Sequence, residues 1–324
     1  MNPTLSVLVA THNRPVLLVE ALDSVVAQTE SDWEIVLVDD GSTPAVDAEA
    51  MTARYGSRIQ VLRHDAPRGS AASRNTAIRH ARGRILAFLD DDDLLAPRFL
   101  AAARSALDRY PTLDLVCLGV SWFGKHADAS RADFVSSTQR FLDEAGGVVL
   151  EPGVREFGAA LLPAILRRVP MALQQQVLRT EAAARLGEFR EGRILDRSDW
   201  AIRAALYLRV GLIEEGLYLQ RCDGQSYASR SDRFVEFLWA GVDLIERLIQ
   251  RAKTESHAQD RMDILHVAAA KSWFDLAYEL AQRGEVATPF KAWLNSQRHH
   301  FSVQRLRFIG RLGLNLLGLG RRSA

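Results

Sequence analysis

The sequence predicts an α/β protein with a mostly parallel, doubly wound sheet, followed by a helical extension at the C-terminus. Three observations support this prediction. Short apolar runs alternate with amphipathic segments over the first 118 residues. Acidic residues follow two of these runs directly, at 39–40 and at 90–93. Beyond residue 231, the apolar residues recur only at helical spacing.

The predicted strands of the first segment are short apolar runs. They cover residues 5–10, 33–38, 59–62, 85–90 and 113–118. Amphipathic helices are predicted between them, beginning near Pro15, Ala45, Ala71 and Pro97, and proline suits the first turn of a helix. Alternation of this kind, with short connections, indicates parallel strands joined by right-handed crossovers.

The rest of the chain is less regular. Residues 122–154 are rich in Gly, Ser and Asp, which predicts long loops of the kind that shape a binding site. Further on, the pattern predicts a strand at 171–178, helices at 179–186 and 201–208, a strand at 217–220, and helices at 234–251, 262–282 and from 289 onward. We therefore expect three segments, 1–118, 119–230 and 231–324.

Four consecutive aspartates, Asp90 to Asp93, follow the apolar run that begins at Ile85. In open α/β sheets, ligands bind at the edge formed by the carboxyl ends of the strands. If the chain leaves the sheet extended, Asp90 and Asp92 point to one side. Carboxylates held side by side repel each other, and a hard divalent cation placed between them and a phosphate relieves that repulsion. An acidic surface loop would explain the same spacing.

Composition and charge exclude several classes of protein. The chain is 48% hydrophobic and 25% charged, as in ordinary globular proteins, and its net charge of +1 gives no field for nucleic acid. Neither a glycine-rich dinucleotide fingerprint nor a GxxxxGK[ST] loop occurs, so carboxylates and a metal would have to hold any nucleotide. Two cysteines, Cys117 and Cys222, are too few for a disulfide scaffold. Without a signal segment or a run of ~18 apolar residues, a cytoplasmic location is expected.

The C-terminal segment is strongly basic. After Glu285 the chain has seven Lys and Arg residues and no acid, so the remainder carries a net charge of −6. Residues 298–324 predict a marginal helix with Leu306, Ile309, Leu312, Leu316 and Leu317 on one side and Gln304, Arg307, Arg311 and Asn315 on the other. This helix would either bind an anionic membrane, as a peripheral protein of the cytoplasmic face, or pack on the protein's own body.

Five motifs in order resemble one known family. They are SVLVATHNRP at the N-terminus, VLVDDGST, RGSAASRN, FLDDDD, and the run from Leu178 through Gly187-Glu188-Phe189 to Ser198-Asp199-Trp200. Together they cover about residues 4 to 225 and resemble the inverting glycosyltransferases of family 2, which have the GT-A fold. The resemblance implies transfer of a sugar, with inversion, from a nucleotide-diphosphate donor, with a UDP-sugar expected. The acceptor would be a saccharide or lipid-linked, as in the synthesis of cell-surface polysaccharides.

The same resemblance assigns site residues. The nucleotide pocket is expected to involve, in chain order, Thr11, Asn13, Arg14, Asp39, Asp40, Arg68, Arg74 and Asp90. Asp39 would accept a hydrogen bond from the uracil N–H, and Asp40 would lie near the ribose. Asp90 and Asp92 would form the metal-binding Asp-x-Asp pair, with Asp90 toward the ribose and Asp92 on Mn²⁺ or Mg²⁺.

The general base is expected at Asp199. The family places a carboxylate second in a Glu-Asp pair before a helix, and the matching residues here are Ser198 and Asp199. Because the glutamate is missing, Asp196 is a competing candidate. A second departure is Cys222, where many relatives have a histidine. A thiol is a soft ligand that suits Mg²⁺ poorly, so Cys222 is not counted as a metal ligand.

Two other functions fit parts of the pattern. A nucleotidyltransferase would also use paired carboxylates and a metal, but it usually has a glycine-rich loop after the first strand, which this chain lacks. The departures at Ser198 and Cys222 leave room for a non-catalytic protein that binds sugar nucleotides or a membrane as a scaffold.

Overall fold

A computed structural model describes residues 2–223 and 233–316 of the chain. The chain divides into two compact units, Met1–Ser226 and Tyr227–Ala324. The predicted segments 1–118 and 119–230 both contribute strands to one sheet, and the first unit contains the first segment and residues 119–226 of the second.

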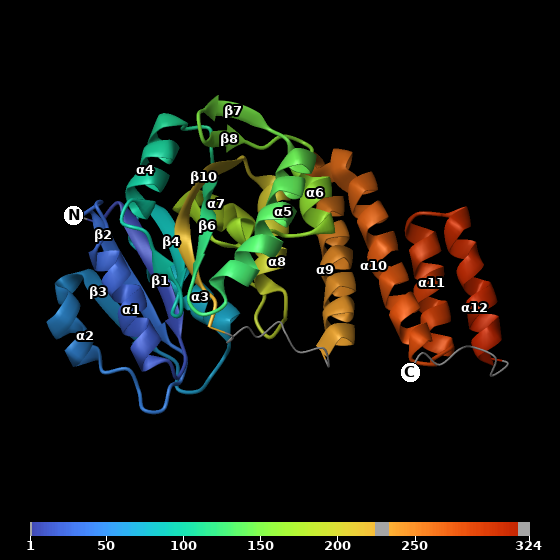
Figure 1. Ribbon diagram of the computed structural model, residues 1–324, viewed down its shortest axis with the longest axis horizontal. Helices are drawn as coiled ribbons and strands as arrows, with labels where there is room; N and C mark the ends of the chain where they lie inside the picture. Colours follow the sequence, from blue (N-terminus) through green and yellow to red (C-terminus); the bar gives the residue numbers. More distant parts are fainter. Residues whose placement is uncertain (1, 224–232, 317–324) are drawn as a thin grey trace. The chain divides into compact units, whose positions relative to one another are not determined.

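The first unit is built on a ten-stranded sheet (Figure 1). Its strands are β1 (Leu5–Thr11), β2 (Trp33–Asp39), β3 (Ile59–Arg63), β4 (Ile85–Asp90), β5 (Leu94–Leu95), β6 (Leu115–Phe123), β7 (Val148–Glu151), β8 (Val154–Glu156), β9 (Gln176–Arg179) and β10 (Val210–Arg221). The order is β3-β2-β1-β4-β9-β6-β10-β8-β7, and β5 pairs with β10. Strands β3, β2, β1 and β4 are parallel, as predicted.

The second half of the sheet is mixed rather than mostly parallel. Strand β9 runs antiparallel to both neighbours, β4 and β6, whereas β6 and β10 are parallel to each other. Strands β7 and β8 add an antiparallel hairpin beside β10. The predicted α/β fold with a C-terminal helical extension is confirmed, and the sheet is parallel without exception only in its N-terminal half.

Eight helices of the first unit connect the described strands. They are α1 (Pro15–Val26), α2 (Ala48–Tyr55), α3 (Ser70–His80), α4 (Phe99–Arg109), α5 (Ala127–Ala145), α6 (Leu161–Arg167), α7 (Thr180–Leu186) and α8 (Asp196–Tyr207). Helix α1 begins at Pro15, where proline supplies the φ of a first turn and needs no N–H partner.

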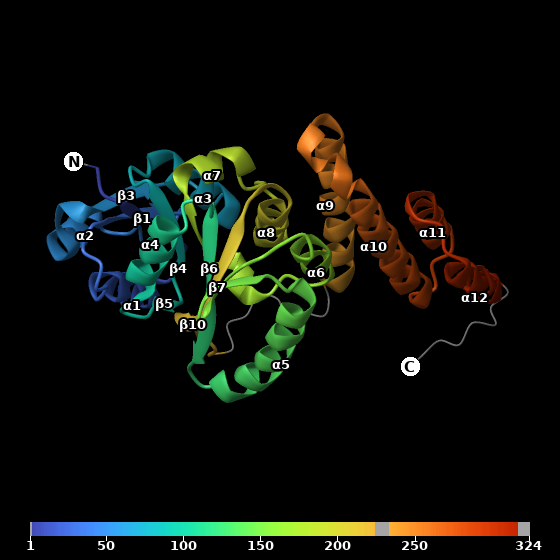
Figure 2. The ribbon, with the colours of Figure 1, turned by 90° about the horizontal axis from the view of Figure 1, so that it is seen from above.

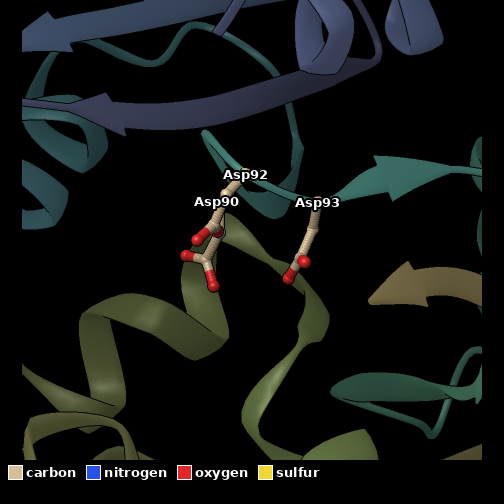
Figure 3. Close-up of side chains that lie close together, drawn as sticks. All are labelled: Asp90, Asp92 and Asp93. Carbon is tan, nitrogen blue, oxygen red and sulfur yellow. The ribbon is translucent and has the colours of Figure 1, made fainter. Parts of the chain in front are cut away.

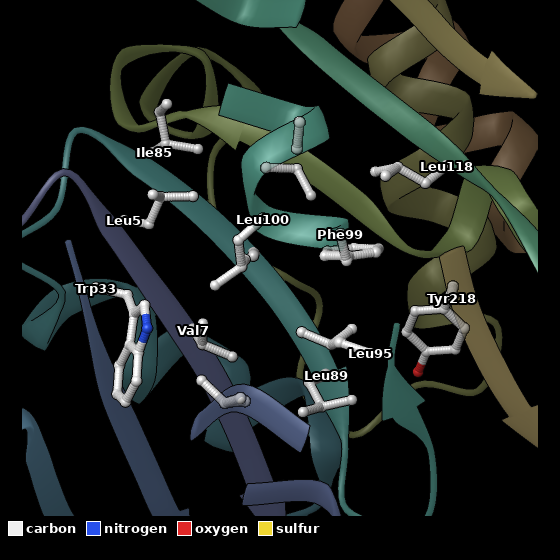
Figure 4. Close-up of a cluster of buried hydrophobic side chains, with 14 of the residues drawn as sticks. Leu5, Val7, Trp33, Ile85, Leu89, Leu95, Phe99, Leu100, Leu118 and Tyr218 are labelled. Atoms are coloured by element: carbon white, nitrogen blue, oxygen red, sulfur yellow. The ribbon is translucent and has the colours of Figure 1, made fainter. Parts of the chain in front are cut away.

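Helices cover both faces of the strands. Alternate side chains such as Val7 and Leu89 join Phe99 and Leu100 in the core formed with α1 and α4 (Figure 4). On the other face, Phe88 makes edge contacts with other aromatic rings, and α3 packs against β1 and β2. Figure 2 shows α3 and α7 on one side of the strands and α1 on the other. Because both faces are buried, the central parallel strands are apolar at most positions, and most of their polar residues stand near the ends.

Three expectations for the middle of the chain were wrong. Residues 122–154 contain the 19-residue helix α5 and the β7–β8 hairpin rather than long loops. Among the described side chains of α5, the buried ones form a narrow stripe that includes Phe141, so the sequence of the helix resembles that of a loop. The strand expected at 171–178 starts only at Gln176, after a 3₁₀ turn. Strand β10 covers twelve residues rather than 217–220, because a bulge at the exposed Glu214 and Glu215 interrupts its apolar pattern.

The second unit is helical, as predicted. Its helices are α9 (Phe234–Thr254), α10 (Met262–Gln282), α11 (Ala287–His299) and α12 (Arg307–Leu316), and α10 packs against each of the others. Phe308 and Leu312 of α12 join Trp293 in a buried core. No helix of the described ranges combines the length and hydrophobicity that crossing a bilayer requires.

The predicted stripe of the C-terminal helix is therefore divided between two environments. Leu312 packs inward on its own unit, whereas Leu306 and Ile309 remain exposed. The predictions for the side chains of Arg311, Asn315 and Leu316, and for residues 317–324, lie outside the described part of the structure.

Candidate functional site

The carboxyl ends of three neighbouring strands meet at one edge of the sheet. The register pairs Thr11 of β1 with Asp39 of β2, and Ala10 with Asp90 of β4. The two acidic clusters of the sequence therefore lie on the same edge, as the alternation of strands and helices predicted.

Three carboxylates form the centre of this edge. Asp90, Asp92 and Asp93 each offer an oxygen, and the three oxygens lie within 4.8 Å of one another (Figure 3). Asp93 had no predicted role. Its Oδ2 accepts a hydrogen bond of 2.8 Å from the Tyr218 hydroxyl, and its Oδ1 accepts one of 2.8 Å from the Arg221 N–H. Cys222 does not belong to this group of described potential ligands.

The charges in this cluster are only partly balanced. Burial raises the pKa of Asp93 to about 7, and the charges of Asp90 and Asp92 add to the rise. Burial and the charge of Asp90 also raise the pKa of Asp92. By contrast, the guanidinium groups of Arg197 and Arg74 outweigh the effect of burial on Asp90 and hold its pKa well below the usual value. A cation bound beside Asp92 and Asp93 would therefore stabilise the ionised forms of these two carboxylates.

Arginines surround the cluster. Arg14 Nη1 donates to Asp91 at 2.9 Å and to Asp92 at 2.8 Å. Arg74 Nη2 lies 3.3 Å from Asp90 Oδ1, and Arg197 also donates to that oxygen. The structure thus brings the predicted Arg14 and Arg74 to the predicted Asp90 and Asp92.

Sequence reasoning missed two of the groups that hold Asp90. Gln175, which precedes β9, donates to Asp90 Oδ2 at 3.2 Å, and Arg197 comes from the first turn of α8. One signal pointed to Arg197. A cation in the first turn of a helix opposes the helix dipole, so it implies a specific carboxylate partner.

Asp39 is engaged by its own loop. Its Oδ1 accepts the Ser42 N–H at 2.8 Å, and its Oδ2 accepts the Val46 N–H at 3.1 Å and a bond from Arg63. Gly41 allows this tight turn, since its φ is +70° and a Cβ there would lie 2.7 Å from the Pro67 nitrogen. A nucleobase would have to use a remaining lone pair of Asp39 or displace Arg63, whose side chain is 40% exposed.

Asp40 organises the turn before α3. Its carboxylate accepts the backbone N–H groups of Arg68 and Gly69 at 2.9 and 2.8 Å, and it lies 2.7 Å from His64 Nδ1. The Arg68 side chain extends to Glu191 at 3.0 Å. The ribose contact predicted for Asp40 stays a prediction. In the structure, the Asp40 carboxylate holds the loop that carries Arg68.

The loop after β1 is held to both acidic clusters. The Thr11 hydroxyl donates to Asp91 at 2.7 Å, and Asn13 Oδ1 accepts the Thr43 N–H at 2.7 Å. Asn13, at φ +56°, and Leu195, at φ +65°, are the non-glycine residues with positive φ in the described chain. Leu195 directly precedes α8 and Asn13 follows β1, so both unusual conformations border this site.

The two candidate bases have different surroundings. Asp199 is 3% exposed, and its Oδ2 accepts two hydrogen bonds from Arg203, at 2.9 and 2.7 Å. Asp196 begins α8, and its Oδ2 accepts from Arg74 at 2.8 Å and from Ser70 at 3.2 Å. The carboxylate of Asp196 is thus linked through Arg74 to Asp90, whereas Asp199 forms a buried ion pair. The base predicted at Asp199 stays a prediction, with Asp196 as the competing candidate.

The buried ion pair leads to a prediction about stability. We expect Arg203→Ala to lower the free energy of unfolding by about 3–5 kcal/mol, because it leaves the Asp199 carboxylate buried without its partner. Arg203 also donates to the carbonyls of Leu186 and Glu188, so further bonds are lost. Urea unfolding followed by tryptophan fluorescence measures the change. Arg190→Ala is the matched control, since Arg190 lies 3.5 Å from Asp199 and is more exposed. Equal stability of the two variants would contradict the prediction.

This fold and site define the class of protein. A mixed sheet with helices on both faces, and an Asp-x-Asp cluster at the carboxyl edge of its parallel half, is a GT-A-type domain. The family model for glycosyl transferase family 2 matches residues 6–154, the part of the chain that contains the first four of the five motifs.

Curated relatives are similar over part of their length. An uncharacterised glycosyltransferase of Haemophilus influenzae is 32% identical over 112 residues, which are 35% of this chain and 37% of that protein. The Escherichia coli UDP-Glc:alpha-D-GlcNAc-diphosphoundecaprenol beta-1,3-glucosyltransferase WfgD is 34% identical over 89 residues, 28% of this chain and 35% of WfgD. The chain thus spans less than two thirds of these relatives.

Solved structures share the fold over most of the chain. Staphylococcus aureus TarS 1–349 in complex with UDP-GlcNAc has a TM-score of 0.63 at 17% identity, over 98% of this chain and 88% of that one. A mannosyltransferase of Pyrobaculum calidifontis, PcManGT, in complex with GDP-Man and Mn²⁺ has a TM-score of 0.50 at 19% identity, over 98% and 81%. At these identities the similarity shows the fold alone.

Proposed function

We propose that this protein is a metal-dependent inverting glycosyltransferase that moves a sugar from a UDP-sugar to a saccharide or lipid-linked acceptor, in the synthesis of surface polysaccharide. The observation that carries the proposal is the Asp90–Asp92–Asp93 cluster, bordered by arginines, within a family 2 domain. The names of WfgD, which include UDP-Glc and a diphosphoundecaprenol-linked GlcNAc, and of the TarS complex with UDP-GlcNAc support the choice of donor and acceptor.

The residues of the cluster fit a divalent cation. Three carboxylate oxygens within 4.8 Å are the hard donors that Mg²⁺ and Mn²⁺ prefer. Asp92 and Asp93 would hold the ion together with Asp90. When bound, the ion would stabilise negative charge on the departing diphosphate as a Lewis acid. Arg14, whose side chain is 41% exposed, can donate to phosphate oxygens at the same place.

An inverting displacement also needs a base for the proton of the acceptor hydroxyl. We assign this role to Asp196, with Asp199 as the alternative. Arg74 contacts the carboxylates of both Asp196 and Asp90. Arg74 and Ser70 donate hydrogen bonds to Oδ2 of Asp196 and hold it in place. Arg74 then has two tasks, since it positions the carboxylate of Asp196 and neutralises that of Asp90.

The experiment that tests the function is release of UDP from UDP-sugars. Full-length protein should release UDP from UDP-glucose or UDP-N-acetylglucosamine only when Mn²⁺ or Mg²⁺ is present, and more rapidly with a suitable acceptor. Binding of the donor without any release would favour the non-catalytic scaffold. Release of pyrophosphate from a nucleoside triphosphate would favour the nucleotidyltransferase. The free thiols of Cys117 and Cys222 are consistent with a cytoplasmic location, which is part of the proposal.

Asp39 leads to a prediction about the donor base. We expect uridine diphosphate to bind at least about tenfold more tightly than adenosine or cytidine diphosphate, a difference of ~1.4 kcal/mol. A carboxylate accepts the ring N–H of uracil, which adenine and cytosine lack. Titration calorimetry with the three nucleotides and Mn²⁺ measures the preference. Equal affinities would contradict the role of Asp39, whereas a preference for guanosine would change only the donor.

A further inference from the structure

We propose that the connection between α11 and α12 docks on an anionic lipid surface. Four apolar side chains of this region are exposed, and we call them the apolar tip: Phe301 is 64% exposed, Val303 68%, Leu306 38% and Ile309 42%. They lie within nine consecutive residues, where the chain passes from α11 to α12 (Figure 1): Phe301 precedes the 3₁₀ turn Val303–Leu306, and Ile309 lies in the first turn of α12.

The apolar tip is distinct from the side of α12 that stabilises the unit. Phe308 and Leu312 point inward, and the Phe308 ring lies 5.5 Å from that of Phe274. The second unit thus uses one set of apolar residues for its core and leaves another set uncovered. The amphipathic stripe predicted from the sequence would have placed Leu312 on the membrane, whereas the structure assigns that surface to the apolar tip.

The backbone beneath the tip is held in place. The Trp293 indole N–H donates to the Arg305 carbonyl at 2.9 Å, and Gln297 bonds both the N–H and the carbonyl of Ser302, at 2.8 and 3.1 Å. Arg305 also donates to the His300 carbonyl at 3.2 Å. Because these backbone groups are already paired, the tip could enter the headgroup region without taking unsatisfied groups with it. Its order also lowers the entropic cost of docking.

Charge identifies the partner as an anionic surface. Arg298, just before the tip, and Arg307, between Leu306 and Ile309, are exposed, and from residue 286 onward the chain contains no acidic residue. Exposed apolar side chains with arginines beside them match the boundary between acyl chains and anionic headgroups. A second copy of this chain is a poorer partner, since two such surfaces would bring like charges together. A nucleic acid is a poorer partner, since its bases could stack on Phe301 but not on the aliphatic Val303.

The test uses the full chain and vesicles of equimolar phosphatidylglycerol and phosphatidylcholine. We expect co-sedimentation that falls with added salt and is weak with pure phosphatidylcholine, because salt screens the arginines. Phe301→Ser with Val303→Ser should lower partitioning at least about tenfold, as should Arg298→Glu with Arg307→Glu. Point variants are preferable to truncation after His300, which would also remove Phe308 and Leu312 from the core.

The matched control replaces exposed valines elsewhere. Val148 and Val149 of β7 are as exposed as the tip residues, so Val148→Ser with Val149→Ser should sediment like wild type. Unchanged thermal melting shows that each variant is folded. Partitioning of the tip variants equal to wild type, or no sedimentation of wild type, would overturn the proposal. The proposal would also be overturned if light scattering showed that the wild-type protein is a dimer, that the tip variants are monomers, and that the protein does not bind vesicles. Because vesicle binding needs no donor or turnover, its failure would leave the proposed transferase function untouched, and the reverse also holds.

Discussion

Asp92→Ala should abolish sugar transfer, with a loss of at least about 10²-fold in turnover, because it would remove a ligand of the proposed cation, which would stabilise the leaving diphosphate by several kcal/mol. Asp92 belongs to the three-carboxylate cluster, and its carboxylate also pairs with Arg14, whose side chain is 41% exposed. The fold should survive, since burial and neighbouring charge already make the ionised form of Asp92 unfavourable. UDP release at increasing Mn²⁺ concentration measures the effect.

The control for this variant is Asp128→Ala, which removes a carboxylate that is 97% exposed on α5. It should have wild-type activity and metal dependence. In wild-type protein, excess EDTA should remove activity and added Mn²⁺ should restore it. Full activity of Asp92→Ala, or full activity of wild type in excess EDTA, would refute the metal role. Calorimetry with UDP should show that the variant loses the metal-dependent part of donor binding.

Asp196→Asn should lower turnover by at least about 10²-fold while the affinity for UDP changes little, because the amide keeps the shape of the side chain but cannot take a proton. Asp199→Asn should act mainly on stability, since Asp199 is enclosed with Arg203. The measurements are initial rates at saturating donor, calorimetry with UDP, and thermal melting of both variants.

A purely structural role of Asp196 must be separated from catalysis, because its carboxylate is also paired with Arg74. If it only positioned Arg74, the Asn variant would raise the donor KM and weaken UDP binding more than it lowers turnover. A pH profile adds a second criterion, since loss of the base should remove the acid limb seen in wild type. A folded Asp199→Asn with the 10²-fold loss, beside an Asp196→Asn near wild type, would return the role to Asp199.

The strands of the N-terminal half could be predicted because their physical requirement is local. A strand covered on both faces is apolar at nearly every position, so runs such as 35–38 and 85–89 are visible without any knowledge of their neighbours. The acids stand at the strand ends for the same reason, as the first positions that leave the buried layer. Their convergence on one edge then follows from the parallel alternation.

Other elements could not be predicted in this way. The described buried side chains of helix α5 form a narrow stripe, and the bulge at Glu214 and Glu215 interrupts strand β10. In neither element do the apolar residues recur at a regular helical or strand spacing. The antiparallel β9 lies between β4 and β6, although its sequence gives no sign of that position. Long-range pairing decides such placements, because the partners are distant in the chain.

For this protein, the sequence by itself determined the apolar strands, the acidic residues at their carboxyl ends, the family motifs and the basic C-terminus, because each is written in neighbouring residues. Only the tertiary structure decided which of Asp196 and Asp199 lies beside Asp90, and which apolar residues of the C-terminal helix are exposed. It also brought Gln175 and Arg197 to Asp90 from more than eighty residues away. The physical reason is that the rotation of a helix about its axis and the elements that pack on it decide which of its side chains face a site, the core or solvent. Contacts between segments distant in the chain fix both the rotation and the packing.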